Sequence, residues 1–188
     1  MAAAHLETEI KLAVRSLAEM RRRLPELGYR IASRRVFEAN DVFDTRQGTL
    51  RSGRRLLRLR SAGGRHTLTY KGPPVIGRHK SRQEIELAVA DPAPVEKILN
   101  ALGFARAFRY EKYRTEYVRP PERGVVTLDE TPIGDFLELE GRPRWIDRTA
   151  FLLGFTPADY ITASYATLYL RDCRRRGVRP ANMVFTRT

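Results

Sequence analysis

The sequence predicts an α+β fold in which a closed β-sheet surrounds a charged interior and helices pack against the outside. The first observation is that Glu7, Glu9 and Lys11 occupy every second position near the N-terminus, with Ile10 and Leu12 on alternate positions. Because successive side chains of a strand point to opposite faces, one face is charged and the other apolar. A sheet that closes on itself, with its apolar face outward, explains why this alternation returns in six further segments: Arg58-Leu-Arg60, Thr69-Tyr-Lys71, Arg82-Gln-Glu-Ile-Glu86, Lys112-Tyr-Arg114, Val125-Val-Thr-Leu-Asp129 and Glu138-Leu-Glu140.

Eight segments are predicted to be strands by their alternation or by their β-branched and aromatic content. They are residues 5–13, 34–45, 54–61, 66–72, 82–89, 107–118, 124–131 and 135–140. Ala62-Gly-Gly64 and Pro120-Pro-Glu-Arg-Gly124 have the composition of turns between neighbouring strands. Residues 72–81 carry three candidate cations and are predicted to form a mobile basic loop, and ordering at a barrel mouth when a ligand binds is the alternative.

Four segments have the pattern of helices. In residues 16–28, Ser16 is the expected N-cap, Glu19 completes a capping box, Pro25 kinks or shortens the helix and Gly28 ends it. The C-terminal helices are expected at residues 145–153 and 164–176, the latter capped by Ser164. The remaining helix, residues 91–103, has one apolar face, formed by Val95, Ile98, Leu99 and Leu102.

The charged faces give the predicted barrel an interior of mixed charge. Two carboxylates at alternate positions of one strand lie roughly 6.8 Å apart, and their repulsion costs roughly 2.4 kcal/mol at an effective dielectric constant of about 20. Arginine and lysine can compensate some carboxylates, and Mg²⁺ or Mn²⁺, which prefer oxygen ligands, can compensate the rest. The anion that fits so many cations is a polyphosphate. The interior acids are Glu7, Glu9, Glu84, Glu86, Asp129, Glu138 and Glu140, and the interior bases are Lys11, Arg58, Arg60, Lys71, Arg82, Lys112 and Arg114.

These motifs resemble those of the CYTH domain family, the triphosphate tunnel metalloenzymes. Glu7-x-Glu9-x-Lys11 is similar to the ExExK signature of that family, and further motifs follow in the family's order through residue 165. The resemblance implies an eight-stranded antiparallel β-barrel, or tunnel, in a single domain over residues 1–188. Its strands would lie within about 5–140 and its C-terminal helices within about 145–176. The further motifs are Phe43-Asp-Thr45, Leu57-Arg-Leu-Arg60, Leu68-Thr-Tyr-Lys-Gly72, Arg82-x-Glu-x-Glu86, Lys112-x-Arg114, Asp129, Phe136-Leu-Glu-Leu-Glu140 and Ser164-Tyr165.

The resemblance also implies a role for each site residue. The metal-binding carboxylates would be Glu7, Glu9, Asp129, Glu138 and Glu140, with Mg²⁺ or Mn²⁺ as the cofactor. The phosphates would be held by Lys11, Arg58, Arg60, Lys71, Arg82, Lys112 and Arg114, because arginine binds phosphate with two donors and lysine with a point charge. Glu84 and Glu86 are expected to orient the arginines, and assistance in proton removal by one of them is the alternative. The residues expected to be catalytic are Glu9, Lys11, Arg58 and Glu140.

The function that the resemblance implies is that of a metal-dependent phosphohydrolase acting on a triphosphate, either inorganic tripolyphosphate or an organic triphosphate. The alternative is a class IV adenylate cyclase, in which the ribose 3′-hydroxyl replaces water as the nucleophile. A non-catalytic module that binds polyphosphate or RNA is a more distant alternative.

Composition excludes some classes of protein and weakens others. The net charge is +13 and 30 of the 35 basic residues are arginine, but the interior charges balance and the remaining basic runs match no nucleic-acid-binding module, so only nonspecific attraction to nucleic acid is expected. Cys173 is the only cysteine, which excludes an internal disulfide and a cysteine metal site. No apolar run reaches membrane-spanning length, and we expect a cytoplasmic protein that has no membrane partner. The sequence leaves open whether the protein forms a homodimer.

Overall fold

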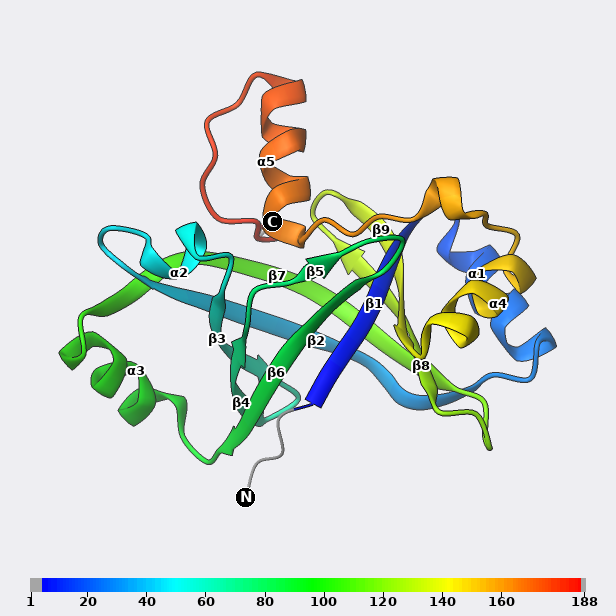
Figure 1. Ribbon diagram of the computed structural model, residues 1–188, viewed down its shortest axis with the longest axis horizontal. Helices are drawn as coiled ribbons and strands as arrows, with labels where there is room; N and C mark the ends of the chain where they lie inside the picture. Colours follow the sequence, from blue (N-terminus) through cyan, green and yellow to red (C-terminus); the bar gives the residue numbers. More distant parts are fainter. Residues whose placement is uncertain (1–4, 187–188) are drawn as a thin grey trace.

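The computed structural model describes residues 5–186 and contains a closed barrel of eight antiparallel strands (Figure 1). The strands follow the order β1-β9-β8-β7-β2-β3-β4-β6, and pairing of β1 with β6 closes the barrel, while β5 lies outside it on β6. This confirms the predicted eight-stranded antiparallel barrel. The strands are β1 (His5–Val14), β2 (Arg30–Thr45), β3 (Leu56–Ala62), β4 (Arg65–Lys71), β5 (Val75–Ile76), β6 (Lys80–Val89), β7 (Phe104–Val118), β8 (Gly124–Thr131) and β9 (Gly134–Gly141).

The helices pack outside the barrel, as predicted (Figure 1). Ser16 caps the first of them by accepting a hydrogen bond from the Glu19 backbone amide, and Ser164 caps the last in the same way with Thr167. None of the helices in the described residues is long and apolar enough to cross a membrane. The helices are α1 (Leu17–Glu26), α2 (Thr49–Ser52), α3 (Pro92–Ala101), α4 (Pro143–Leu152), the short 3₁₀ helix η1 (Pro157–Asp159) and α5 (Tyr165–Arg176).

The apolar faces of β1, β8 and β9 form the main core together with α1 and α4. Ile10, Leu128 and Leu139 are fully buried on the outer face of the barrel. Leu24 of α1 and Ile146 of α4 pack against them and are also fully buried. Figure 1 shows α1 and α4 side by side against this wall. Covering the apolar face leaves the charged face for the interior, which is the arrangement that the alternation predicts.

A second, smaller core lies under α3, and the prediction for this helix was only partly right. Leu99 is buried and Val95 packs beside it, but Ile98 and Leu102 are 59% and 67% exposed. Positions 95 and 99 form one row along the helix and positions 98 and 102 the next. The helix contacts the sheet through one row, so the other faces solvent.

The segment 72–81 is not simply the mobile basic loop that we expected. Val75 and Ile76 pair with Ser81 and Lys80, and β6 begins at Lys80 rather than at residue 82. Lys80 also pairs with Glu9, because β1 offers a free edge there. The proline and glycine residues that suggested a loop end at Gly77, before the strand begins.

Trp145 packs on two glycines at the ends of β8 and β9, and this contact gives a test of the fold. Gly124 and Gly141 are paired across the strands. A Cβ atom at Gly124 would lie 2.4 Å from the Trp145 ring, whose Nε1 donates to Glu122 at 2.7 Å. The ring therefore has little freedom to move.

We expect Gly124→Ala to lower the free energy of unfolding by about 1–3 kcal/mol, because it overpacks this contact. Urea denaturation measures the change. Gly77→Ala is the control, since a Cβ atom there meets only the His79 carbonyl oxygen at 3.9 Å. An equal loss in both variants would contradict the packing argument.

Candidate active site

The strand register brings the predicted site residues together inside the barrel. On β1 and β9, Glu9 lies opposite Glu140 and Lys11 opposite Glu138. On β1 and β6, Glu7 lies opposite Arg82. Residues paired in this way share one face of the sheet. The interior thus has an acidic row, which we define as Glu7, Glu9, Glu138 and Glu140.

Lysine side chains reach three members of the acidic row. Lys71 Nζ lies 2.6 Å from Glu7 Oε2, and Lys11 Nζ lies 2.9 Å from Glu138 Oε1. Glu9 forms an ion pair with Lys80. Burial opposes ionisation of Glu9, but the charges of Lys11 and Lys80 outweigh it and lower the pKa of this carboxyl. Glu9 is therefore charged, and each of these three acids has a cation beside it.

Glu140 is the member of the acidic row that makes no ion pair within residues 5–186. Burial, followed by the charge of Glu7, raises the pKa of Glu140 to about 7. Glu84, near the same end of the barrel, also has its pKa raised to about 7, chiefly by burial and despite the nearby charge of Lys71. At neutral pH these two carboxyl groups are partly protonated.

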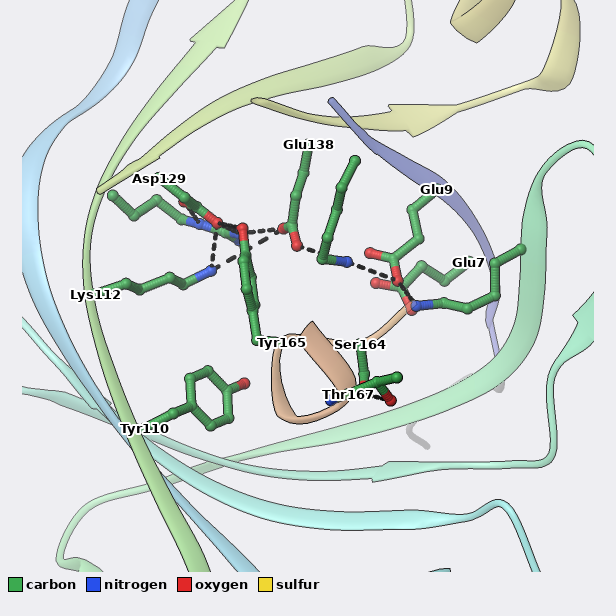
Figure 2. A network of polar contacts seen from close by, with 12 residues as sticks. Glu7, Glu9, Tyr110, Lys112, Asp129, Glu138, Ser164, Tyr165 and Thr167 are labelled. Atoms are coloured by element: carbon green, nitrogen blue, oxygen red, sulfur yellow. Dashed lines mark hydrogen bonds and ion pairs between the residues drawn. The ribbon is translucent and has the colours of Figure 1, made fainter. Parts of the chain in front are cut away.

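Asp129 lies in a different environment from the acidic row. Its side chain is fully buried and accepts hydrogen bonds from Lys112 Nζ at 2.8 Å, from Arg114 Nε at 2.7 Å and from the Tyr165 hydroxyl at 2.7 Å. Figure 2 shows Tyr165 pointing from the start of α5 toward Asp129, with Lys112 beside them. The Asp129 carboxylate thus holds two of the predicted phosphate-binding cations in place.

The opposite wall of the barrel is formed by β2, β3 and β4. Arg58 donates to the Tyr110 hydroxyl and to Thr69 Oγ1, both at 3.2 Å. Its pKa is raised because the Tyr110 hydroxyl and nearby carboxylates outweigh the effect of burial. Arg60 lies 3.6 Å from Glu86 Oε1. Glu86 thus lies beside Arg58 and Arg60, whereas Glu84 contacts Lys71 rather than an arginine.

Four interior residues were absent from the predicted site. Glu38 lies 3.6 Å from Lys112, and Lys80 forms an ion pair with Glu9. The Tyr110 hydroxyl accepts a hydrogen bond from Arg58, and the Tyr165 hydroxyl donates one to Asp129. Burial opposes ionisation of Glu38, but Lys112 and neighbouring arginines lower its pKa to about 2. Glu38 could have been found from its alternation with Asn40 in a predicted strand. Tyr165 belongs to a quoted motif but was given no role.

The C-terminal segment packs against one end of the barrel. Residue Ile161 pairs with Lys11 beyond the end of β6, and Met183 pairs with Tyr110 beyond the end of β8. Tyr165 packs between them against Phe136, with the ring centroids 5.6 Å apart. Figure 1 shows α5 standing at this end.

The acidic row fits a divalent cation in its chemistry. All four donors are carboxylates from two adjacent strands, and oxygen-only ligation suits Mg²⁺ or Mn²⁺. Glu140 is a largely buried carboxyl without an ion pair in the described residues, which a cation would supply. Among residues 5–186, no three acidic, histidine or cysteine side chains are already arranged as a metal site, and three of these carboxylates contact lysines instead.

Comparison with known proteins identifies one family model and a curated relative that match most of the chain. The model of the family described as CYTH domain matches residues 5–144. A protein of Methanocaldococcus jannaschii named "putative adenylate cyclase" is 29% identical over 135 residues, which are 72% of this chain and 76% of that protein.

Two solved structures show the same fold. A "putative adenylate cyclase" from Vibrio parahaemolyticus has a TM-score of 0.75 and 20% identity, covering 88% of this chain and 98% of that one. A "putative adenylyl cyclase" from Hippeastrum, described as having a dominant triphosphatase activity, has a TM-score of 0.61 and 20% identity, covering 93% and 97% of the two chains.

The raised pKa of Glu140 and Glu84 predicts how the stability of the metal-free protein depends on pH. Between pH 4.5, the ordinary value of a glutamate, and about 7, the folded protein binds protons that the unfolded chain has released. The free energy of unfolding should therefore fall as pH rises through this range. Chemical denaturation at several pH values, with a chelator present, measures the slope.

Glu140→Gln should reduce that slope, and adding Glu84→Gln should reduce it further. Glu26→Gln is the control, because Glu26 is on the surface in α1. The assignment would be wrong if Glu140→Gln left the slope unchanged.

Proposed function

Because this chain belongs to the CYTH domain family, we propose that it is a metal-dependent phosphohydrolase that binds a triphosphate inside the barrel. The substrate would be inorganic tripolyphosphate or an organic triphosphate. The observation that carries this proposal is the division of one buried interior into two walls. The acidic row lies on β1 and β9 with Lys11 beside it, and the other arginine and lysine side chains project from β3, β4, β6 and β7.

The cationic wall has donors that a phosphate chain can accept. Within the described residues, Arg58 Nε and Asn40 Nδ2 are buried and have no hydrogen-bond partner. Asn40 lies opposite both Arg60 and Tyr110, so these donors share the interior face. Buried donors without partners are costly, and phosphate oxygens would satisfy them.

Each group of residues would then have a defined task. Arg58 and Arg60 would bind phosphate oxygens, while Asp129 would position Lys112 and Arg114 by holding their donors. The contacts of Asp129 favour this positioning role over the direct metal ligation that the sequence suggested. Glu7, Glu9, Glu138 and Glu140 would hold the divalent cation. When bound, this cation would shield the phosphate charge and help to activate water.

Adenylate cyclase activity is the second candidate. The relatives from M. jannaschii and V. parahaemolyticus carry that name, and the same two walls would hold the phosphates of ATP. Cyclisation also requires the ribose 3′-hydroxyl to lie in line with the α-phosphate, which demands contacts to the nucleoside. A module that only binds polyphosphate or RNA is the least favoured function, because it would not need the acidic row.

The products formed from two substrates decide between these activities. Incubation with tripolyphosphate, and separately with ATP, in Mg²⁺ and in Mn²⁺, should release pyrophosphate and phosphate from tripolyphosphate, and a chelator should stop the reaction. Chromatography identifies the products. Cyclic AMP from ATP, with tripolyphosphate unchanged, would establish the cyclase instead. Binding without any turnover would support the non-catalytic module.

Arg58→Ala tests the cationic wall. Losing a charge-assisted contact costs about 1.5–3 kcal/mol, so kcat/KM should fall by roughly 10- to 150-fold. Arg175→Ala is the matched control, because Arg175 is 78% exposed on α5 and its one ion pair within residues 5–186 is with Asp172. Steady-state kinetics measure both variants. Similar losses in the two would mean that the substrate does not bind in the barrel.

A further inference from the structure

Lys80 differs from the other lysines of the interior in the number of carboxylates it contacts. Lys71 contacts Glu84 at 3.0 Å in addition to Glu7. Lys11 contacts Glu138 at 2.9 Å and also lies 3.6 Å from Glu9. Within residues 5–186, the one ion pair of Lys80 is with Glu9.

The surroundings of Lys80 make that single ion pair important. Its side chain is 5% exposed, and the side chain of Glu9 is 8% exposed. The other charges that act on Lys80 include two cations, Lys11 and Arg82. A buried ammonium group that loses its partner carries a large desolvation cost unless another anion replaces it.

A divalent cation at the acidic row would remove that partner. Glu9 is one of the carboxylates assigned to the cation, and it cannot serve the cation fully while it neutralises Lys80. Lys71 would keep Glu84, which is not assigned to the cation, and the charge of Asp129 would still act on Lys11. Within residues 5–186, no second carboxylate contacts Lys80. The anion available to replace Glu9 in the interior is the phosphate chain of the substrate.

We propose that Lys80 is an exchangeable counterion: it neutralises Glu9 in the metal-free protein and binds a substrate phosphate once a divalent cation has taken Glu9. This inference rests on the proposed function and adds a residue to it. It also makes metal and substrate binding interdependent, since the cation takes Glu9 from Lys80 and the substrate phosphate then neutralises Lys80. By linkage, the effect of metal on substrate affinity equals that of substrate on metal affinity.

Lys80→Met tests the exchange, because it removes the charge and keeps a side chain of similar length. Without substrate, the variant should bind Mn²⁺ more tightly, by roughly 10-fold, since the ammonium group nearest to Glu9 no longer competes with the metal. Titration followed by electron paramagnetic resonance measures free Mn²⁺ directly. At saturating Mn²⁺, the tripolyphosphate concentration for half-maximal rate should rise roughly 10-fold or more. The two affinities thus change in opposite directions.

Two further variants control this experiment. Lys80→Arg keeps the charge and should leave Mn²⁺ affinity close to that of the wild type. Lys97→Met removes an exposed lysine of α3 and should change neither quantity. Thermal melting checks that Lys80→Met folds, and Lys80→Gln replaces it otherwise.

Some outcomes would overturn the proposal. Unchanged or weaker Mn²⁺ binding by Lys80→Met would mean that Lys80 does not compete for Glu9, even if the wild type is an active triphosphatase. An unchanged half-saturating concentration would overturn the phosphate contact. A wild type without activity on any triphosphate would overturn the proposed function, while the Mn²⁺ titration would still decide the competition for Glu9.

Discussion

The neutralisation of buried charge is the constraint on which this structure depends. A closed barrel removes its inner face from water, and an unpaired ion there carries a penalty of several kcal/mol. The strand register meets this constraint by placing opposite charges within reach, as with Lys11 and Glu138 across β1 and β9. Where the register provides no opposite charge, the carboxyl group binds a proton more readily. Glu140, without an ion pair in the described residues, has its pKa raised to about 7.

Much of the fold follows from the sequence because the strands alternate so regularly. A charged residue at every second position identifies both the strand and the face that turns inward, as at Glu7 and Glu9. The prediction of strands failed where proline and glycine residues interrupt the alternation. Lys80 follows a segment rich in proline and glycine, and β6 extends back to this residue, beyond the predicted residue 82, where it pairs with the edge of β1. Such long-range pairing leaves no local signal.

The candidate site was predictable as a set of residues but not as a set of contacts. All the residues assigned to metal or phosphate lie in strands of the barrel. Sequence spacing could not show that Asp129 accepts from Tyr165, which comes 36 positions later on a different element. Nor could it show which lysine contacts one carboxylate and which contacts two, since that depends on side-chain reach in three dimensions. The apolar face of α3 is a similar case, because the seating of the helix decides that Leu102 is exposed.

The position of β1 has a consequence for how the chain is made. This strand is synthesised before its partners, which are β6 and β9 on its two sides and Ile161 at the end of its β6 edge. During translation both edges of β1 therefore remain unpaired until β6 and β9 have left the ribosome. Contacts of such long sequence separation slow folding, and unpaired strand edges favour aggregation. Nascent chains of this protein that stop before β9 should depend on chaperones.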